Sequence, residues 1–516
     1  MKRKMLCLSA LLFLFAGVAS GQETEVKPSD FDGPAAVFIK NPGILTAIDF
    51  AASVPADTIY AEFEKGELLP FVLTDTAYVS VYNYAADETF VYDTIRVYSR
   101  KPENIVRLGN NGGWFTSIDI SKLTGLEWLN FEHNYLESID VSHNPELQML
   151  YLDDNMGIST LDVTHNPKLE LLDVEMLALT ELDVSQNKNL MHLGIGYTDI
   201  AEINLDSNRN LYELLVTSTP MTELNTSIFP NLQYLSVSYS HISELDVTKN
   251  PKLFQLYACG MRGEPIEYID VTQCPELQIF FASTNALEKV DFSNNPKLKS
   301  IYVYANQLRE LDISNNPDVI ELICWDNYLT YATLPHREIN YYTALPQNEM
   351  AIAERYEAGE KIDFSAQLMV NEARTSYEWK TGDEYPYVTL LEGVDYEIEN
   401  GVTRFLRAQP DPVFCEMSNA FFGELSLTTS RTTIWSEDMA SEESGKPAFQ
   451  LAAKDGKLQI KMAAAMQVEV FDVKGIRVFG AETLCGIREI SLPCSGMYLV
   501  RLSHLGRVWT EKVMVY

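Results

Sequence analysis

The sequence is poor in positive charge. Its 516 residues include 39 lysines and arginines against 73 aspartates and glutamates, which gives a net charge of −34. A surface of this charge is repelled by phosphate backbones and by anionic lipid surfaces, so the composition argues against nucleic acid as a partner. The hydrophobic fraction of 46% and the charged fraction of 22% are typical of a globular protein rather than a disordered one.

The sequence also lacks an apolar run long enough to cross a bilayer, which takes about 20 residues of helix. An apolar stretch between Met5 and Val18 follows three basic residues and precedes the small residues at positions 19–21. A positive start, a short apolar stretch and small residues are typical of a secretory signal peptide. We therefore predict that residues 1–21 are a signal peptide and that the mature chain has no transmembrane segment.

Cysteine is scarce, with seven in the chain and six after residue 21. An even number would allow disulfides in an oxidising compartment. Cys485 and Cys494, however, flank an alternating segment that predicts one extended strand, which would hold them too far apart to bond. We interpret most of the cysteines as small buried apolar residues, and the disulfide status stays open.

Residues that usually carry catalysis are not grouped. The seven histidines are scattered, and we find no zinc-binding helical spacing, phosphate-cradling glycine loop or serine elbow. His143 and His165 occupy equivalent positions in a repeat, but two imidazoles alone seldom make a metal site. We therefore expect a protein without catalytic residues or cofactor. An enzyme with its site in residues 22–104 or 345–434 stays an alternative.

The main feature that is present is a ten-fold repeat with a period of about 21 residues. One half of each unit has the pattern Leu-Asp-Val-Ser/Thr-x-Asn-Pro-x-Leu, and the other half has the pattern Leu-x-x-Leu-x-Leu-x-x-Asn. Copies of the first half begin at Ile118, Ile139, Leu161, Leu182, Ile203, Leu224, Leu245, Ile269, Val290 and Leu311. A fixed period of this length predicts a solenoid, in which leucine columns form the core and an asparagine column bonds the turn backbone.

The second half of the unit resembles the leucine-rich repeat family over residues 105–332, as in Leu147, Leu150, Leu152 and Asn155. The resemblance implies a solenoid with a concave binding face, and suggests adhesion or host interaction of the internalin kind. The Leu-Asp-Val half alternates inward and outward residues, which predicts extended structure on the convex side too. We predict a mainly β protein: a leucine-rich-repeat solenoid of about ten 21-residue units, flanked by β-sandwich-type domains.

The segments beside the repeat predict β-domains. Residues 22–104 contain alternating aromatic and β-branched runs, and a β-domain there would cap the apolar end of the stack. Residues 333–434 contain strand-like runs at the spacing of a sandwich. Trp379 and Cys415 lie where an immunoglobulin-like domain keeps its core tryptophan and second cysteine, although the first cysteine is missing. The polar residues 435–448 predict a linker.

Residues 449–516 differ from the rest of the chain in charge, because there are nine basic residues and six acidic residues from Leu451 onward. A Phe-Asp-x-x-Gly-x-x-Val motif begins at Phe471, and a Gly-x-Tyr-Leu-Val motif begins at Gly496. Together they resemble the C-terminal sorting domain of the type IX secretion system of Bacteroidota. The resemblance implies passage through the periplasm, with the type IX secretion machinery as a partner, and release or attachment at the outer-membrane surface. The final Tyr516 departs from the basic last residue of many members.

The aspartates of the Leu-Asp-Val half form a column of their own. Its members are Asp119, Asp140, Asp162, Asp183, Asp246, Asp270, Asp291 and Asp312, with Asn204 and Asn225 between them. Unpaired carboxylates on coils about 4.8 Å apart would repel one another. Either local hydrogen bonds satisfy the oxygens, or Ca²⁺ bridges them, with Asp246, Asp270, Asp291 and Asp312 as candidate ligands. The lack of a glycine-rich calcium loop favours local hydrogen bonds.

The outward positions of the leucine half change along the stack from acidic to aromatic. We predict a ligand-binding site on the concave face, formed by Trp128, Asp153, Asp173, Tyr234, Tyr239, Tyr257, Phe281, Tyr302, Tyr304 and Trp325. Aromatic residues dominate binding hot spots and also stack on sugars, so a protein and a glycan ligand, including one from a host, stay open. The rings could instead pair across coils for stability, or a flanking sandwich could cover them.

The sequence therefore favours a secreted or cell-surface binding and adhesion protein. A surface enzyme and a calcium-stiffened structural spacer are the alternatives.

Overall fold

A computed structural model describes residues 26–40, 47–54, 57–62, 68–73, 79–82, 94–110, 112–260, 265–382, 385–436, 449–454, 457–504 and 507–515. The predicted signal peptide and most of the predicted linker lie outside these residues. The chain forms two compact units. One comprises residues 1–350, 367–376 and 417–428, and the other comprises residues 351–366, 377–416 and 429–516.

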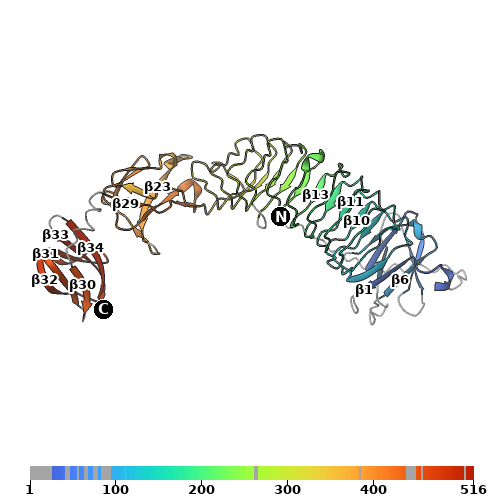
Figure 1. Ribbon diagram of the computed structural model, residues 1–516, viewed down its shortest axis with the longest axis horizontal. Helices are drawn as coiled ribbons and strands as arrows, with labels where there is room; N and C mark the ends of the chain where they lie inside the picture. The colour runs from blue at the N-terminus through green and yellow to red at the C-terminus, as the bar shows by residue number, and fades with distance from the viewer. Residues whose placement is uncertain are drawn as a thin grey trace. The chain divides into compact units, whose positions relative to one another are not determined.

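Short parallel strands, one per coil, dominate the first unit (Figure 1). They are β9 (Trp128–Asn130), β10 (Met149–Tyr151), β11 (Leu171–Asp173), β12 (His192–Gly194), β13 (Glu213–Leu215), β14 (Tyr234–Ser236), β15 (Gln255–Tyr257), β16 (Ile279–Phe281), β17 (Ser300–Tyr302), β18 (Glu321–Ile323) and β19 (Tyr341–Thr343). Each pairs in register with the next, so that Leu150 lies between Leu129 and Leu172. The predicted fold class, mainly β with a leucine-rich-repeat solenoid, is confirmed.

Burial within each coil follows the repeat. The middle residue of every strand from β9 to β18 is buried, whereas its two neighbours are half-exposed in nearly all of them. In the Leu-Asp-Val half, Leu182 and Val184 are buried and Asp183 between them is exposed. The predicted alternation is therefore present. The hydrogen-bonded pairing is not: apart from β8 (Phe115–Asp119), no strand is assigned to this half in the described coils, and one coil has the 3-10 helix η3 (Thr226–Ile228) instead.

Asparagine side chains join neighbouring coils through the core. The Asn155 amide donates to the Phe131 carbonyl of the previous coil at 2.7 Å and to the Leu152 carbonyl of its own coil at 2.8 Å. A second asparagine column lies in the turns that follow the Leu-Asp-Val half, where Asn208 donates to the carbonyls of Val184 and Asn187 at 3.1 and 2.9 Å. Both columns are buried, so each amide satisfies backbone carbonyls that water does not reach.

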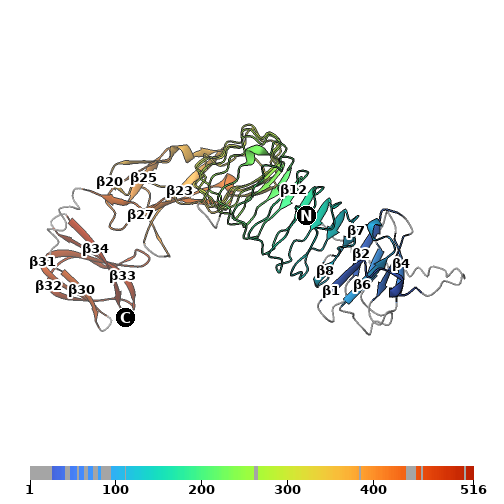
Figure 2. The same ribbon diagram turned by 45° about the vertical axis from the view of Figure 1, so that its right-hand side comes forward.

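Antiparallel strands cover the N-terminal end of the stack (Figures 1 and 2). Strands β2 (Ala47–Ala52), β5 (Val79–Tyr82) and β7 (Ile105–Gly109) continue the sheet of the solenoid beyond β9. Strands β1 (Ala36–Lys40), β3 (Thr58–Glu62), β4 (Leu68–Val72) and β6 (Thr94–Ser99) form a second sheet with β8. Four fully buried rings fill the space between the sheets: Phe38 lies about 6 Å from Phe50, Phe115 and Phe131.

Short strands also make up the segment after the solenoid. They are β20 (Arg355–Glu357), β21 (Lys361–Asp363), β22 (Met369–Val370), β23 (Ala373–Thr381), β24 (Val388–Thr389), β25 (Tyr396–Glu399), β26 (Val402–Phe405), β27 (Val413–Asn419), β28 (Ser426–Thr428) and β29 (Thr433–Trp435). The ring of Trp379 is fully buried, and its Nε1 donates to Thr403 Oγ1 at 3.1 Å. Cys415 is buried and forms no disulfide.

The last segment is a five-stranded antiparallel sheet. Its strands are β30 (Phe449–Lys454), β31 (Lys457–Asp472), β32 (Arg477–Ser491), β33 (Gly496–His504) and β34 (Arg507–Val515), and they share one apolar core. The Phe-Asp-x-x-Gly motif forms the turn after β31. There Asp472 Oδ1 accepts from the backbone N–H groups of Lys474 and Ile476, both at 2.9 Å, and Gly475 has a φ of +75° that favours glycine.

The buried asparagines give a first testable prediction. Replacing Asn208 with Ala removes two buried hydrogen bonds, while the carbonyls of Val184 and Asn187 each keep one backbone N–H donor, so the free energy of unfolding should fall by about 1–3 kcal/mol. Asn210→Ala is the matched control, because that side chain is exposed and donates a hydrogen bond to Lys188 O. Urea unfolding of both variants measures the difference, and equal small losses would contradict the assigned role of the column.

Candidate ligand-binding face of the solenoid

The outward side of strands β9 to β18, here called the sheet face, carries nine of the ten residues predicted for the site. Trp128 and Tyr234 are the first residues of their strands, and Asp173, Tyr257, Phe281 and Tyr302 are the last. Asp153, Tyr304 and Trp325 follow their strands by two residues. Tyr239 does not belong to this set. It lies in the turn beyond β14 with a φ of +60°, which sends its backbone out of the strand direction.

Five of these side chains form a continuous row, here called the aromatic ladder: Tyr257, Phe281, Tyr302, Tyr304 and Trp325. Ring centroids lie 6.0 Å apart between Tyr257 and Phe281 and 4.4 Å apart between Phe281 and Tyr302. Tyr304 and Trp325 are stacked at 4.6 Å with 10° between their planes. All five rings are half-buried. The predicted cross-coil pairing therefore exists, and the paired rings stay partly exposed.

The other predicted aromatic residues lie outside this ladder. Tyr234 contacts Tyr212 and Phe254, with centroids 6.4 and 5.7 Å away. Trp128 contacts Tyr151 at 6.0 Å. Tyr151 occupies an outward position of the leucine half and follows the same alternation as the predicted residues. Tyr212 and Phe254 each precede a strand by one residue, so strand alternation does not identify them.

Hydrogen bonds hold the polar ends of the ladder. The Tyr257 hydroxyl donates to Gln255 Oε1 at 2.9 Å. Burial, followed by a hydrogen bond with Glu321, raises the pKa of Tyr302. Burial also raises the pKa of Tyr257. These phenols stay neutral at physiological pH, so the ladder presents apolar rings with neutral hydrogen-bonding groups. Such a surface suits either a protein or a sugar ligand.

Carboxylates gather on the sheet face of the earlier coils. Asp173 and Glu175 lie directly over two glycines of the next coil, because a Cβ at Gly194 would be 2.8 Å from Asp173 Oδ1 and a Cβ at Gly196 would collide with Glu175 Oε1. Burial and the charge of Asp173 raise the pKa of Glu175 to about 7. Only glycine at these two positions leaves room for the acidic side chains to fold down onto the sheet.

Asp153 belongs to the same group. Burial, the charge of Asp173 and a hydrogen bond with Glu132 raise the pKa of Asp153 to about 7. Near neutral pH Asp153 and Glu175 are therefore partly protonated, which reduces the repulsion between them and Asp173. A cationic group on a ligand could replace those protons, since an opposite charge favours the ionised carboxylates.

Two residues beside this group were not predicted from the sequence. His192 Nδ1 lies 2.9 Å from Glu213 Oε2 on the next coil. Both residues are the first of their strands, and their register makes them direct neighbours. Their spacing of 21 residues was the available signal. One histidine and one glutamate in different coils have no recognisable motif, so only the register of the sheet brings them together.

Local hydrogen bonds satisfy the aspartate column on the other side of the coils. Asp162 Oδ1 accepts from the backbone N–H and the hydroxyl of Thr164 at 2.9 and 2.6 Å, and Asp246 makes the same pair of bonds with Thr248. These bonds hold the pKa of both carboxyls below the usual range. Among the described residues, no three His, Cys, Asp or Glu side chains are grouped as metal ligands. Calcium at Asp246, Asp270, Asp291 and Asp312 stays a hypothesis.

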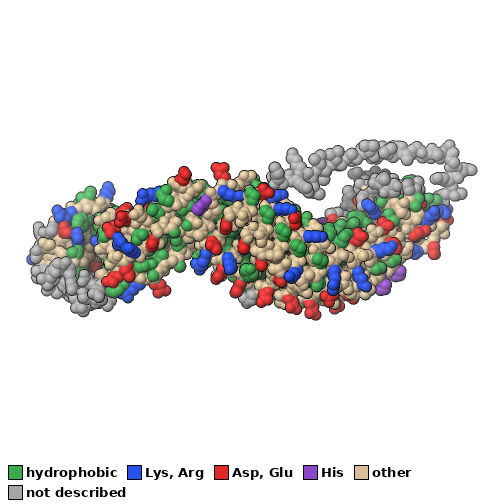
Figure 3. Space-filling view, turned by 90° about the horizontal axis from the view of Figure 1, so that it is seen from above, with side chains coloured by type: hydrophobic (Ala, Val, Ile, Leu, Met, Phe, Trp, Pro, Cys, Tyr) green, Lys and Arg blue, Asp and Glu red, His purple; other side chains and the backbone are tan. Residues whose placement is uncertain are grey.

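The remaining surface is mixed. On the side of the molecule shown in Figure 3, hydrophobic, acidic and basic side chains are interspersed, and no large basic patch is visible. None of the helices within the described ranges has the length and apolar composition to cross a membrane.

Comparison with known proteins supplies structural neighbours. No protein-family model matches the chain, and no curated protein matches it in sequence. Among solved structures, the functional domain of InlJ from Listeria monocytogenes is similar, with a TM-score of 0.47, 21% identity, and coverage of 68% of this chain and 95% of the other. An internalin (inlF) from the same species has a TM-score of 0.36 and 18% identity, covering 45% and 85%. A leucine-rich-repeat protein of Leptospira interrogans has a TM-score of 0.35 and 20% identity, covering 42% and 64%. These neighbours are internalin-like leucine-rich-repeat proteins.

The raised carboxyl pKa values give a second prediction. The pKa of Asp153 is about 7 in the folded state and about 4 in the unfolded chain, so the folded state holds this proton more tightly. The stability that the proton contributes is complete below pH 4 and is lost as the pH rises through about 7. Asp153→Asn removes the titrating carboxyl, so the variant does not lose this stability as the pH rises. The melting temperature of the variant should therefore exceed that of the wild type by about 2–4 °C at pH 8, and by less at pH 5.

The control is Asp199→Asn, which removes an exposed aspartate from a nearby coil. Scanning calorimetry of all three proteins between pH 5 and pH 8 makes the comparison. A difference between Asp153→Asn and the wild type that does not change with pH would show that Asp153 does not titrate in this range.

Proposed function

We propose that this protein is a secreted or cell-surface binding protein, and that its sheet face recognises a protein or glycan ligand. The aromatic ladder is the observation that carries the proposal. Five half-exposed rings from four consecutive coils form one surface on a rigid scaffold. Preorganised aromatic side chains give large contact areas at low entropic cost, and they dominate binding energy at interfaces.

The cluster of acidic side chains at the other end of the sheet face supports the proposal of a ligand that makes two kinds of contact. Coils β10 to β12 offer acidic groups, and coils β15 to β18 offer rings. A ligand that spans these coils would place a cationic group near Asp153 and Glu175 and a flat or apolar group on the ladder. Binding by a surface of this kind needs no catalysis, and we propose that the protein is not an enzyme.

The proposal includes export. The basic start and apolar stretch of residues 1–21 support secretion, and the motifs of residues 449–516 support recognition by the type IX secretion machinery. The last five strands have a core of their own, as a separately recognised module requires. After passage through the periplasm the protein would act at the outer-membrane surface or in the medium. For residues 333–434 we propose an immunoglobulin-like sandwich, in which Trp379 is the core tryptophan.

The aromatic ladder can be tested directly. The mature chain, residues 22–516, is applied to arrays of glycans and of surface proteins, and the affinity of each hit is measured by surface plasmon resonance. Tyr304→Ala with Trp325→Ala removes the stacked pair and should weaken binding at least about ten-fold. The melting temperature should fall by only about 4 °C, because both rings are half-exposed.

Tyr268→Ala is the matched control, since Tyr268 is an exposed aromatic residue that is not on a strand of the sheet. It should bind like the wild type. The class of the hits distinguishes a protein ligand from a glycan. Binding that survives loss of the stacked pair would place recognition elsewhere on the chain.

The export proposal has its own test. Deleting residues 449–516 should leave the protein in the periplasm of a host with a type IX secretion system, because the sorting signal is gone. Immunoblots of periplasmic, outer-membrane and culture fractions measure the distribution. A truncated chain that still reaches the medium in normal amounts would refute the role of this module in sorting.

A further inference from the structure

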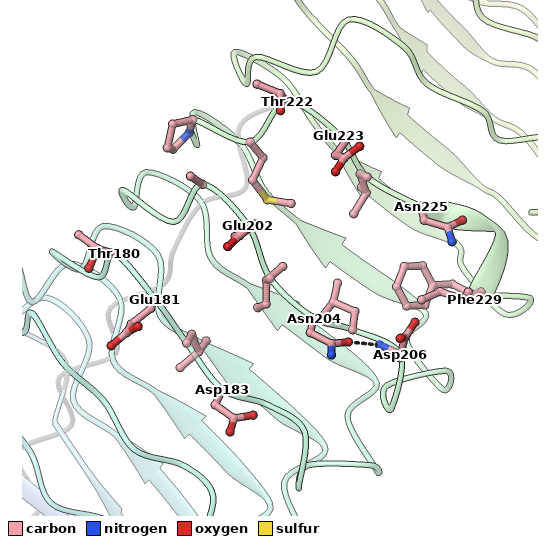
Figure 4. Close-up of a pocket in the computed structure, with 18 of the residues that line it drawn as sticks. Thr180, Glu181, Asp183, Glu202, Asn204, Asp206, Thr222, Glu223, Asn225 and Phe229 are labelled. Atoms are coloured by element: carbon pink, nitrogen blue, oxygen red, sulfur yellow. Dashed lines mark hydrogen bonds between the residues drawn. The ribbon is translucent and has the colours of Figure 1, made fainter.

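A second recessed surface lies on the opposite side of the coils. A groove of about 1710 Å³ is lined by equivalent segments of consecutive coils, chiefly residues 180–183, 201–206, 220–225 and 243–246 (Figure 4). We call it the reverse groove. It contains the Leu-Asp-Val half of the repeat and none of the sheet-face residues. The predicted binding site therefore does not account for it.

A row of four glutamates follows one wall of the groove: Glu181, Glu202, Glu223 and Glu244. They are 21 residues apart, one per coil, and all are exposed. Figure 4 shows three of them, Glu181, Glu202 and Glu223, in a line across successive coils. Within the described part of the chain, no hydrogen bond or ion pair holds any of the four. Like charges repeated at this spacing repel one another.

Apolar side chains form the floor. Leu182, Ile203 and Leu224 line the groove, and in the sequence each follows a residue of the glutamate row. The residues that come next, Asp183, Asn204 and Asn225, form a row that Figure 4 shows running parallel to the glutamates. The helix η3 adds Ile228, and Phe229 follows directly after it. Ile203, Leu224 and Ile228 are half-buried, so a ligand can reach them. The groove thus combines a contactable apolar strip with acidic walls.

The groove has charge of one sign only. Eight of its lining residues are Asp or Glu, and none is Lys, Arg or His. Other coils neutralise exposed carboxylates with lysines of the next coil, as in the ion pairs Lys168–Glu146 and Lys297–Glu276. The coils that form the groove lack such lysines among its lining residues. The absence of a paired lysine beside the four glutamates, within the described residues, is a local property and does not follow from the repeat itself.

We propose that the reverse groove binds an extended, basic segment of a partner protein. Lysine or arginine side chains of the segment would pair with the glutamate row, and its apolar side chains would cover Ile203, Leu224 and Ile228. Three intervals between coils span roughly 14 Å, the length of about four extended residues. Charge complementarity selects a basic partner, and the apolar floor selects a polypeptide over a simple cation. This inference is independent of the function proposed for the sheet face.

The test uses the mature full-length protein and a fluorescein-labelled peptide, Lys-Val-Lys-Thr-Lys-Val-Lys-Thr-Lys, in 0.15 M NaCl. Fluorescence anisotropy measures its dissociation constant. Glu202→Gln with Glu223→Gln removes two members of the row and should weaken binding at least about ten-fold. The matched control is Glu288→Gln with Glu310→Gln. It removes the same charge from later coils, and Glu310 occupies the repeat position of Glu223, so binding should change less than about two-fold.

A floor variant separates the groove from general attraction to an acidic protein. Leu224→Ser should weaken binding of the valine-containing peptide, but it should not weaken binding of a peptide in which both valines are replaced by glycine. The proposal would be overturned if the groove variant and the control variant lose affinity for the peptide equally, or if the wild type does not bind the peptide. Two results together would assign the groove to small polycations and would also overturn the proposal. They are complete displacement of the peptide by spermine and unchanged binding of the peptide to Leu224→Ser.

Discussion

The need to satisfy backbone carbonyls between stacked coils determines most of this structure. A coil in the middle of the solenoid has neighbours on both sides, so its turn carbonyls meet protein rather than water. The amides of Asn155 and Asn208 meet this need by donating to carbonyls of the preceding coil. Because these amides reach equivalent atoms of the preceding coil, most copies of the repeat begin 21 or 22 residues apart; the interval from Leu245 to Ile269 is the exception, at 24 residues.

A constant period turns variable positions into columns. Side chains from coils far apart in sequence become neighbours at the spacing of β-strands, and the aromatic ladder is the clearest result. Tyr257 and Trp325 are 68 residues apart in the chain, yet both belong to one row of contacting rings. Since each coil packs only on the coils beside it, such a row changes with little effect on the core. Stability thus depends on the inward columns, whereas the proposed recognition depends on the outward ones.

The sequence predicts this division well where alternation decides it. The repeat identifies the strands, their inward leucines and nine of the ten predicted site residues on the sheet face. Tyr239 lies instead in a turn with positive φ, where strand alternation no longer determines which way a side chain points. The repeat also misses the pair of His192 and Glu213, which depends on register between coils. The reverse groove was missed for a third reason: its shape depends on how several coils pack together.

The chain has a net charge of −34, and the solenoid reduces the repulsion between its acidic side chains in a different way in each column. In the aspartate column, local hydrogen bonds such as those from Thr164 to Asp162 stabilise the charged form. On the sheet face, Asp153 and Glu175 hold protons near neutral pH because burial raises the pKa of both. Elsewhere, lysines of adjacent coils pair with glutamates. Within the described residues, the glutamate row of the reverse groove uses none of these devices; water and dissolved ions screen its repulsion, and the basic segment proposed above would reduce it further.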